Sequence, residues 1–153
     1  MLNIGEIAPD FTLPCDGGGT LKLSSLRPDN VILFFYPKDD TPGCTKEAIS
    51  FSQNLDAFQA TGTLVFGISK DTVAKHEKFR DKHSLGVPLL SDSEGTVCED
   101  YGVWVEKKMY GKTFLGIERT TVLINGSGEI LNVWNKVKVP GHVEDVLSMV
   151  KSL

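Results

Sequence analysis

Two short, continuous apolar runs stand out against the amphipathic pattern of the rest of the chain. They cover residues 31–36 and 63–69, are rich in β-branched and aromatic side chains, and are bounded by Pro37 or by polar residues. Runs of this kind are typical of strands that are buried on both faces. Between them, residues 42–60 place apolar side chains at helical spacing, namely Ala48, Phe51, Leu55 and Phe58. The pattern therefore predicts a strand–loop–helix–strand unit at the centre of the fold.

Weaker patterns flank this unit on both sides in the sequence. Residues 10–14 and 20–23 alternate around a glycine cluster and predict an N-terminal β-hairpin. A helix capped by its first residue is expected over residues 71–84. After a short strand, a brief helix is expected over residues 94–101, and this helix carries Cys98.

The C-terminal third alternates more regularly and ends in an amphipathic helix. Residues 107–112 are polar and turn-like, while residues 117–124 and 129–134 match two strands joined by an Asn-Gly-Ser-Gly turn. Residues 142–153 then place apolar side chains on one helical face. This order of elements predicts an α/β fold with a mixed central sheet, flanking helices and a single domain over residues 1–153.

Composition narrows the class of protein and its compartment. Of the 153 residues, 41% are hydrophobic and 24% are charged, which is ordinary for a globular protein with a sizeable core. The net charge of −4 and the lack of a basic patch argue against nucleic acid and anionic membranes as partners. The first residues lack a signal-peptide pattern, and three cysteines are too few for a disulfide framework. We therefore expect a cytoplasmic protein whose cysteines are free or catalytic.

One cysteine lies where the sequence itself predicts a reactive thiol. Thr41 is a good N-cap, Pro42 suits the first helical position, and Cys44 then falls in the first turn of the helix. Unpaired backbone N–H groups at that position stabilise an anion and should lower the pKa of the thiol toward neutrality. A buried, inert cysteine is the commoner alternative. The polar and turn-forming neighbours of Cys44 favour an exposed, reactive thiol instead.

The residues around this cysteine resemble the active-site signature of the peroxiredoxins. The pattern P-x-x-x-T-x-x-C runs from Pro37 to Cys44, and the longer string F-Y-P-K-D-D-T-P-G-C-T-K-E-A is similar to the branch called bacterioferritin comigratory protein, or peroxiredoxin Q. Further stretches follow in the order of that branch: G-E-I-A-P-D-F-T-L-P, F-G-I-S-K-D, L-L-S-D, Y-G-V-W, K-K-M-Y-G-K and G-I-E-R-T-T-V-L-I. The resemblance covers most of the chain and implies a thioredoxin-like fold with an N-terminal β-hairpin extension.

The resemblance also implies a thiol peroxidase that needs no cofactor or metal, and it assigns roles to individual residues. A Cys44 thiolate would attack hydrogen peroxide or an organic hydroperoxide and become a sulfenic acid. Thr41 would orient the peroxide, Pro37 would shield the pocket, and Arg119 would lie against the sulfur and bind the peroxide. Glu47 would hold that arginine in place, and because Glu47 alone would disfavour a thiolate, a nearby cation is required. Donors to the developing oxyanion are expected from the backbone N–H groups at the helix start, those of Gly43 and Cys44.

The step that regenerates the thiol is where this sequence departs from many members of the family it resembles. Those members carry a second cysteine at the position that here holds Ile49, or near the position of Arg80. Cys98 and Cys15 remain, the first expected to be packed and the second to be exposed at the hairpin turn. We therefore favour a one-cysteine cycle in which thioredoxin, glutaredoxin or glutathione reduces Cys44 directly. A two-cysteine cycle with Cys98 as the resolving residue is the alternative.

Other chemistry-bearing residues carry weaker signals. His76 and His83 lie seven residues apart on one predicted helix without a third ligand at metal spacing, so we expect no metal site. Asp39 and Asp40 are expected in a solvated loop. Residues 104–110 include two aromatic side chains and a methionine that suit a peroxide pocket, a partner surface or the core.

Two classes of function fit the same fold. The first is the thiol peroxidase, and the second is a redox sensor in which oxidation of Cys44 switches a partner surface. The set of Thr41, Cys44 and Arg119 favours the enzyme, because a sensor needs no complete peroxide-binding site. The resemblance suggests a monomer, whereas the reductant and the preferred hydroperoxide are not written in the sequence.

Overall fold

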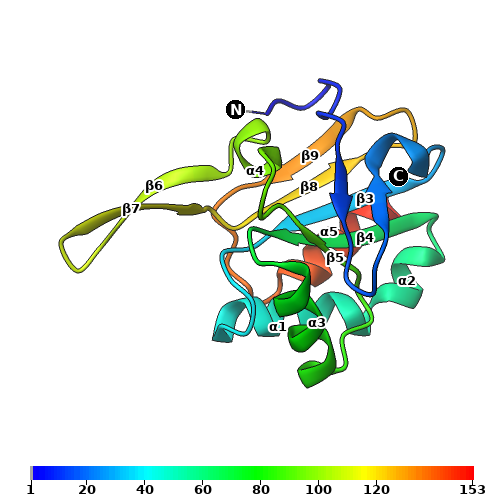
Figure 1. The fold of residues 1–153 in the computed structure, drawn as a ribbon. Coiled ribbons are helices and arrows are strands. Elements are labelled where there is room, and N and C mark those ends of the chain that lie inside the picture. The colour runs from blue at the N-terminus through cyan, green and yellow to red at the C-terminus, as the bar shows by residue number, and fades with distance from the viewer. Residues whose placement is uncertain (1) are drawn as a thin grey trace.

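A five-stranded mixed sheet forms the centre of the computed structural model, which describes residues 2–153 (Figure 1). The strand order is β5-β4-β3-β8-β9. The bounds are β3 Asn30–Phe35, β4 Thr63–Ser69, β5 Leu89–Ser91, β8 Thr120–Ile124 and β9 Ile130–Trp134. Strands β3, β4 and β5 run parallel, whereas β8 pairs antiparallel with β3 and β9 pairs antiparallel with β8. The expected α/β fold with a mixed sheet is confirmed, and β3 is its middle strand.

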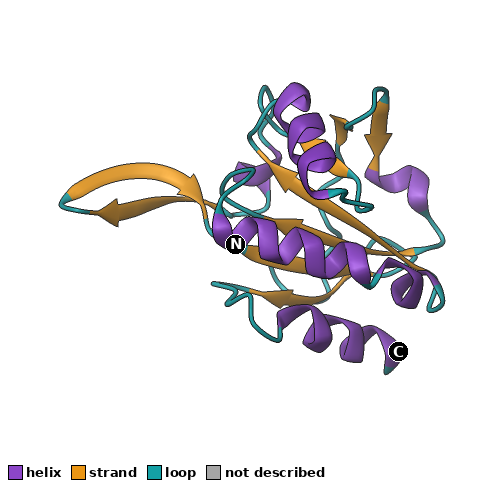
Figure 2. Ribbon diagram, turned by 90° about the horizontal axis from the view of Figure 1, so that it is seen from below, coloured by secondary structure: helices purple, strands orange, loops and turns teal. Residues whose placement is uncertain are grey.

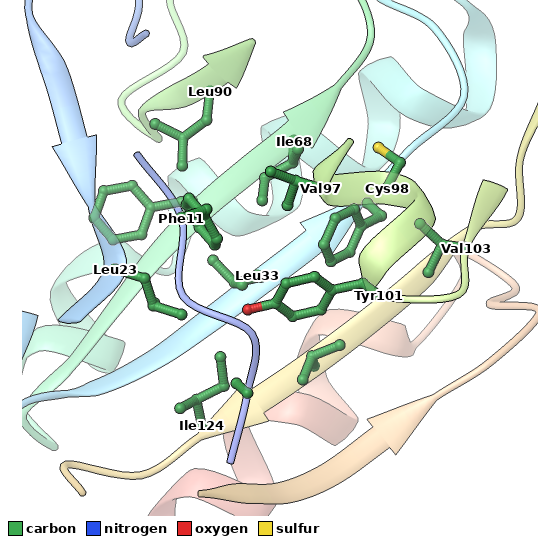
Figure 3. Close-up of a cluster of buried hydrophobic side chains, with 14 of the residues drawn as sticks. Phe11, Leu23, Leu33, Ile68, Leu90, Val97, Cys98, Tyr101, Val103 and Ile124 are labelled. Atoms are coloured by element: carbon green, nitrogen blue, oxygen red, sulfur yellow. The ribbon is translucent and has the colours of Figure 1, made fainter. Parts of the chain in front are cut away.

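Side chains of β3 alternate between two separate buried clusters, because successive residues of a strand point to opposite faces. Even-numbered residues from Ile32 to Tyr36 belong to a cluster that we call the helical-face cluster. Odd-numbered residues from Val31 to Phe35 belong to a second cluster, the hairpin-face cluster (Figure 3). The helical-face cluster is covered by α1 Pro42–Gln53, α2 Leu55–Gln59, α3 Val73–His83 and α5 His142–Lys151. The hairpin-face cluster is covered by β1 Thr12–Pro14, β2 Thr20–Lys22, the short 3-10 helix Leu23–Leu26 and α4 Val97–Asp100.

An aromatic contact fastens α1 to the middle strand. The ring of Phe51 on α1 stacks on the ring of Phe34 on β3, with centroids 4.5 Å apart, and both side chains are fully buried. Stacked aromatic pairs add about 1 kcal/mol beyond the burial of their apolar area. Because only residues 36–41 separate β3 from α1, the start of α1 lies at the carboxyl end of β3, which is where sites form in open α/β sheets.

The helices differ from the sequence-based expectation mainly at their ends. The predicted helix over residues 42–60 is broken at Asn54, whose side-chain Nδ2 donates to Ser50 O at 2.8 Å. Helix α3 is capped by Thr72, which accepts from Lys75 N, because the carboxylate of Asp71 is used elsewhere. The predicted helix over residues 94–101 shortens to α4. None of the helices between residues 2 and 153 is long and apolar enough to cross a membrane.

The largest departure is an extended ribbon that projects from the body of the molecule (Figure 2). Strands β6 Trp104–Met109 and β7 Lys112–Ile117 pair antiparallel and are joined at Tyr110 and Gly111, which have φ angles of 52° and 74°. Two consecutive residues in the left-handed region match a tight hairpin turn. The expected turn at residues 107–112 is therefore mostly strand, and the expected strand at residues 117–124 is interrupted after Ile117. The interruption holds Glu118 and Arg119 outside the strands.

Candidate active site

The chain enters α1 at Thr41 through a loop of residues 37–40 that follows β3. Thr41 has extended backbone angles and is the N-cap residue, and Pro42 takes the first helical position as expected. The Thr41 hydroxyl makes no cap hydrogen bond, and instead it donates to the carbonyl oxygen of Lys38 at 2.8 Å. Because its proton is used in this way, Thr41 Oγ1 presents lone pairs to any further ligand.

Cys44 lies in the first turn of α1 but is only 1% exposed. It belongs to the helical-face cluster, together with Tyr36 at the end of β3 and Ala48 one turn later on α1. The expectation of an exposed thiol is therefore wrong. The polar sequence neighbours of Cys44 face away, while apolar residues from other elements bury the sulfur. Its chemistry then depends on the few polar groups that reach it.

Arg119 reaches the sulfur from the interruption between β7 and β8. Its Nη2 donates to Cys44 Sγ at 3.4 Å, and its Nη1 donates to Glu47 Oε1 at 2.8 Å. A fixed guanidinium in this place stabilises negative charge on the sulfur. The structure thus brings together three of the predicted site residues, although Cys44 and Arg119 are 75 positions apart in the sequence.

Glu47 is fully buried, and Arg119 is its partner in the described part of the chain. Burial raises the pKa of the Glu47 carboxyl, and the guanidinium opposes that rise. Glu47 Oε2 has no hydrogen-bond partner among residues 2–153. A buried carboxylate with an unsatisfied oxygen is costly unless it is paired with a cation. The pair therefore fixes the position of Arg119.

Gly43 lies against the guanidinium of Arg119, and Pro37 lines a cavity next to the ribbon. A Cβ atom at Gly43 would lie 3.1 Å from Arg119 Nη2, so a side chain there would crowd the guanidinium. Pro37 lines a cavity of about 330 Å³ together with Trp104, Phe114 and Leu115 of the ribbon. The sequence left the role of residues 104–110 undecided. Trp104 lines this cavity, whereas the ribbon tip is exposed to solvent, with Tyr110 96% exposed.

The other two cysteines lie away from this site. Cys98 is fully buried in the hairpin-face cluster (Figure 3). Cys15, expected to be exposed, is partly buried against the same cluster. Burial, with a further contribution from Asp92, raises the pKa of the Cys98 thiol. Burial likewise raises the pKa of Cys15 to about 11, and Asp16, which accepts from Cys15 Sγ at 3.4 Å, adds to the rise. Cys98 lies on the opposite face of the central sheet from Cys44, and Cys15 pairs with Leu90 at the β5 edge of that sheet.

Sequence reasoning missed one polar group close to the site. Asp39, expected to be solvated, is nearly buried, and its Oδ2 lies 2.6 Å from Nδ1 of the fully buried His76. Its neighbour Asp40 is exposed as expected and pairs with His83 at 2.8 Å and with Lys82 at 2.7 Å. The sequence offered two signs of this contact, namely an acidic pair in the loop and two histidines seven residues apart on one helix. Nothing in the local pattern said which of the two acids is buried.

Comparisons with known proteins agree with this geometry. The model of the AhpC/TSA family matches residues 4–133. A Coxiella burnetii protein is 53% identical over 146 residues, covering 95% of this chain and 97% of that protein. Peroxiredoxin Bcp of Bacillus subtilis is 43% identical over 152 residues, covering 99% of this chain and 97% of that protein.

Solved structures give the same result for the fold. The crystal structure of a Xylella fastidiosa PrxQ mutant superposes with a TM-score of 0.94 at 37% identity, covering 99% of this chain and 97% of that chain. A Xanthomonas campestris bacterioferritin comigratory protein, studied for its alkyl peroxide reduction activity in a trapped intermediate/ligand complex, gives a TM-score of 0.88 at 39% identity. That match covers 93% of this chain and 90% of that chain. The thioredoxin-like fold with an N-terminal hairpin is confirmed.

Proposed function

The chain belongs to the AhpC/TSA family, in its Bcp branch of peroxiredoxins, and we propose that it reduces hydroperoxides through Cys44 in a one-cysteine cycle. Membership makes it a thiol peroxidase. The contact between Arg119 Nη2 and Cys44 Sγ is the observation that carries the assignment of the site. Burying a guanidinium and a carboxylate beside a sulfur costs folding free energy. Such an arrangement is typical of a sulfur that carries negative charge during a reaction.

The peroxide step needs an ionised sulfur, an oriented peroxide and donors for the leaving oxygen. The Cys44 thiolate attacks the terminal oxygen of the hydroperoxide, so that an S–O bond forms and the O–O bond breaks. The leaving oxygen takes up a proton and departs as water or an alcohol, which leaves a sulfenic acid on Cys44. Thr41 Oγ1 accepts a hydrogen bond from the peroxide, because its own proton is donated to Lys38. Arg119 and the N–H groups of Gly43 and Cys44 stabilise the developing charge.

The positions of the other thiols support reduction by an external thiol. A disulfide requires Cα atoms within about 7 Å of one another, whereas packed layers are about 10 Å apart. Cys98 and Cys15 contact the hairpin-face cluster, and Cys44 lies in the helical-face cluster. An external thiol therefore attacks the sulfenic sulfur, water leaves, and a second thiol releases Cys44 from the mixed disulfide. Thioredoxin, glutaredoxin and glutathione are the candidate reductants.

The cavity beside Pro37 supports organic hydroperoxides as substrates in addition to hydrogen peroxide. Trp104, Phe114 and Leu115 form an apolar wall that suits an alkyl group, while the rest of the lining includes Asp71 and three lysines. Alkyl peroxide reduction is the activity for which the Xanthomonas campestris relative was studied. The expected consequence is that small alkyl hydroperoxides are reduced as well as hydrogen peroxide.

The test is the fate of each thiol after one equivalent of hydrogen peroxide without reductant. Wild type and Cys98→Ser should both stop at a sulfenic acid on Cys44, which dimedone traps and intact-mass measurement detects. Cys44→Ser should be oxidised at least about 1,000-fold more slowly, because burial and a neighbouring carboxylate, Asp16 or Asp92, raise the pKa of each of the other two thiols. Addition of thioredoxin and its reductase should then return the oxidised wild type to the thiol form and support turnover.

Other outcomes separate the alternatives. An intramolecular disulfide in wild type that is missing in Cys98→Ser, or in Cys15→Ser, would establish a two-cysteine cycle. Oxidation of Cys44 that no thiol reverses would favour a redox sensor. A wild type that is oxidised no faster than Cys44→Ser would overturn the peroxidase assignment of the site.

A further inference from the structure

A buried polar network lies directly beneath the loop that enters the active site. Its centre is His76 on α3, which is fully buried. His76 Nδ1 lies 2.6 Å from Asp39 Oδ2, and Tyr36 at the end of β3 donates its hydroxyl to Asp39 Oδ1, also at 2.6 Å. On its other side, the backbone N–H of Asp39 donates to Asp71 Oδ2 at 2.8 Å. Asp39 is therefore held through both its side chain and its backbone.

Hydrogen-bond geometry determines the protonation of His76. Its Nε2 lies 2.9 Å from the carbonyl oxygen of Leu90, which is an acceptor only, so Nε2 carries a proton. Its Nδ1 faces the carboxylate of Asp39 at 2.6 Å, a distance typical of a charge-assisted hydrogen bond. A ring with acceptors at both nitrogens is satisfied as an imidazolium.

Charge leads to the same assignment. The ionisable groups that face His76 are Asp39 in the loop, Asp71 before α3 and Tyr36 at the end of β3. Two carboxylates and one imidazolium leave a single net negative charge in a buried place, whereas a neutral histidine would leave two. Burial acts to lower the pKa of His76, but the hydrogen bond and charge of Asp39, with Leu90 and Asp71, outweigh it and raise the pKa above its usual value.

We propose that His76 is a positioning residue for the peroxidase reaction, whose imidazolium holds the loop of residues 37–40 and hence Pro37 and Thr41 in their working geometry. Pro37 precedes this loop's central residues and Thr41 follows them, so both depend on how Asp39 is anchored. Lys38 O, which accepts the hydrogen bond of the Thr41 hydroxyl, belongs to the same loop. Displacement of the loop would change which lone pair Thr41 presents to the peroxide. The inference rests on the proposed function of Cys44.

The pH dependence follows from the sign of the shift. The contact between His76 and Asp39, which we call the clamp, is intact while the ring keeps its proton. Both ring nitrogens face acceptors and the pKa of His76 is raised, so the proton is retained above the usual pKa of histidine. The clamp opens on the alkaline side, as pH rises through the raised pKa of His76. Wild type at high pH should therefore behave like a variant that has no imidazolium.

The experiment compares wild type with His76→Gln, which keeps hydrogen-bonding capacity but carries no charge. The readout is the single-turnover rate of Cys44 oxidation by hydrogen peroxide between about pH 6 and pH 10, at a temperature where both proteins are folded. At neutral pH the variant should be slower by about tenfold, since a small misplacement of reacting groups can cost up to about 100-fold. The ratio of the two rates should shrink toward one as pH rises.

A matched control and a second route keep the test decisive. Glu77→Gln alters another side chain of α3, which accepts from Gly17 N at 3.0 Å away from the loop, and the rate of Cys44 oxidation in this variant should be within about twofold of wild type at every pH. Asp39→Asn approaches the same clamp from the loop and should reproduce the neutral-pH loss if His76→Gln does not fold. A variant that carries both His76→Gln and Asp39→Asn should oxidise Cys44 no more slowly than the slower of the two single variants, because the two side chains act as a pair.

Two results would overturn the inference while leaving the proposed function intact. One is a rate for both His76→Gln and Asp39→Asn equal to that of wild type at neutral pH. The other is a reduced rate whose ratio to wild type stays constant with pH, as a merely structural role would give. If wild type itself is not oxidised at Cys44, the proposed function fails, and this inference fails with it.

Discussion

Cys44 and Cys98 are both buried cysteines in the first turn of a helix, yet their surroundings differ in the sign of the nearest charge. Arg119 donates to the Cys44 sulfur at 3.4 Å. At the start of α4, the carboxylate of Asp92 accepts from the backbone N–H groups of Val97 and Cys98 at 3.2 and 2.8 Å. The N–H groups that would stabilise a thiolate at Cys98 are therefore already used by an anion.

The comparison shows that neither burial nor position in a helix distinguishes a reactive thiol in this protein. Cys44 is 1% exposed and Cys98 0% exposed, so accessibility gives no difference. The distinguishing feature is the partner, a guanidinium in one case and a carboxylate in the other, which stabilise opposite protonation states of a thiol. Replacing each partner is the direct way to test this explanation.

Removing the cation should have the largest effect. Arg119→Ala should slow oxidation of Cys44 by hydrogen peroxide about 100-fold or more, because the sulfur and the leaving oxygen lose a donor and Glu47 is left unpaired. Arg119→Lys keeps the charge but cannot bind Cys44 and Glu47 at once as the guanidinium does. Its oxidation rate should therefore lie between those of wild type and Arg119→Ala. Stopped-flow measurement of the single-turnover rate is the check.

A surface arginine provides the control for this substitution. Arg80 on α3 contacts Asp16 at 3.4 Å and Asp81 at 3.0 Å, away from the sulfur of Cys44. The rate of Cys44 oxidation in Arg80→Ala should therefore be within about twofold of the wild-type rate. Arg119→Ala with an unchanged rate would mean that the guanidinium does not activate Cys44.

The rate of alkylation and its dependence on pH should differ between Cys15 and Cys98. In Cys44→Ser, iodoacetamide should modify Cys15 about tenfold faster for each unit of pH from neutrality up to about 11, because the thiolate fraction rises tenfold per unit below the pKa. Cys98 should stay unmodified while the protein is folded, since it is fully buried. Mass spectrometry of each peptide measures both rates. A flat pH profile for Cys15 would contradict the raised pKa.

Neutralising the anion beside Cys98 should have the smallest effect and should leave the peroxidase reaction alone. Asp92→Asn removes the charge that faces Cys98 and the ion pair with Lys70 at 3.3 Å. The free energy of unfolding should fall by about 1–2 kcal/mol, measured in urea, with oxidation of Cys44 unchanged within about twofold. Asp100→Asn on the exposed side of α4 should cost less than about 0.5 kcal/mol. Slower oxidation of Cys44 in Asp92→Asn would show that the two faces of the sheet are coupled.

Local pattern was sufficient for the elements that build the site. The apolar run that forms β3, the N-cap at Thr41 and the proline after it predict the strand, the loop and the start of α1, because these features act between residues close in sequence. Resemblance to a family added Arg119 and Glu47, which composition and spacing do not single out. Local pattern failed at the ribbon of β6 and β7, whose register depends on pairing between two largely solvent-exposed segments.

By itself, then, the sequence determined the strand–loop–helix unit, the place of Cys44 in its first turn and the mixed α/β order. Tertiary structure decided which groups face each thiol: the arrival of Arg119 from a position 75 residues away, the burial of Cys44, and the sheet between it and Cys98. It also decided that Asp39 is buried against His76 while Asp40 stays in solvent. The physical reason is that periodicity reports which face of an element is apolar, whereas charge pairing is set by which elements pack together.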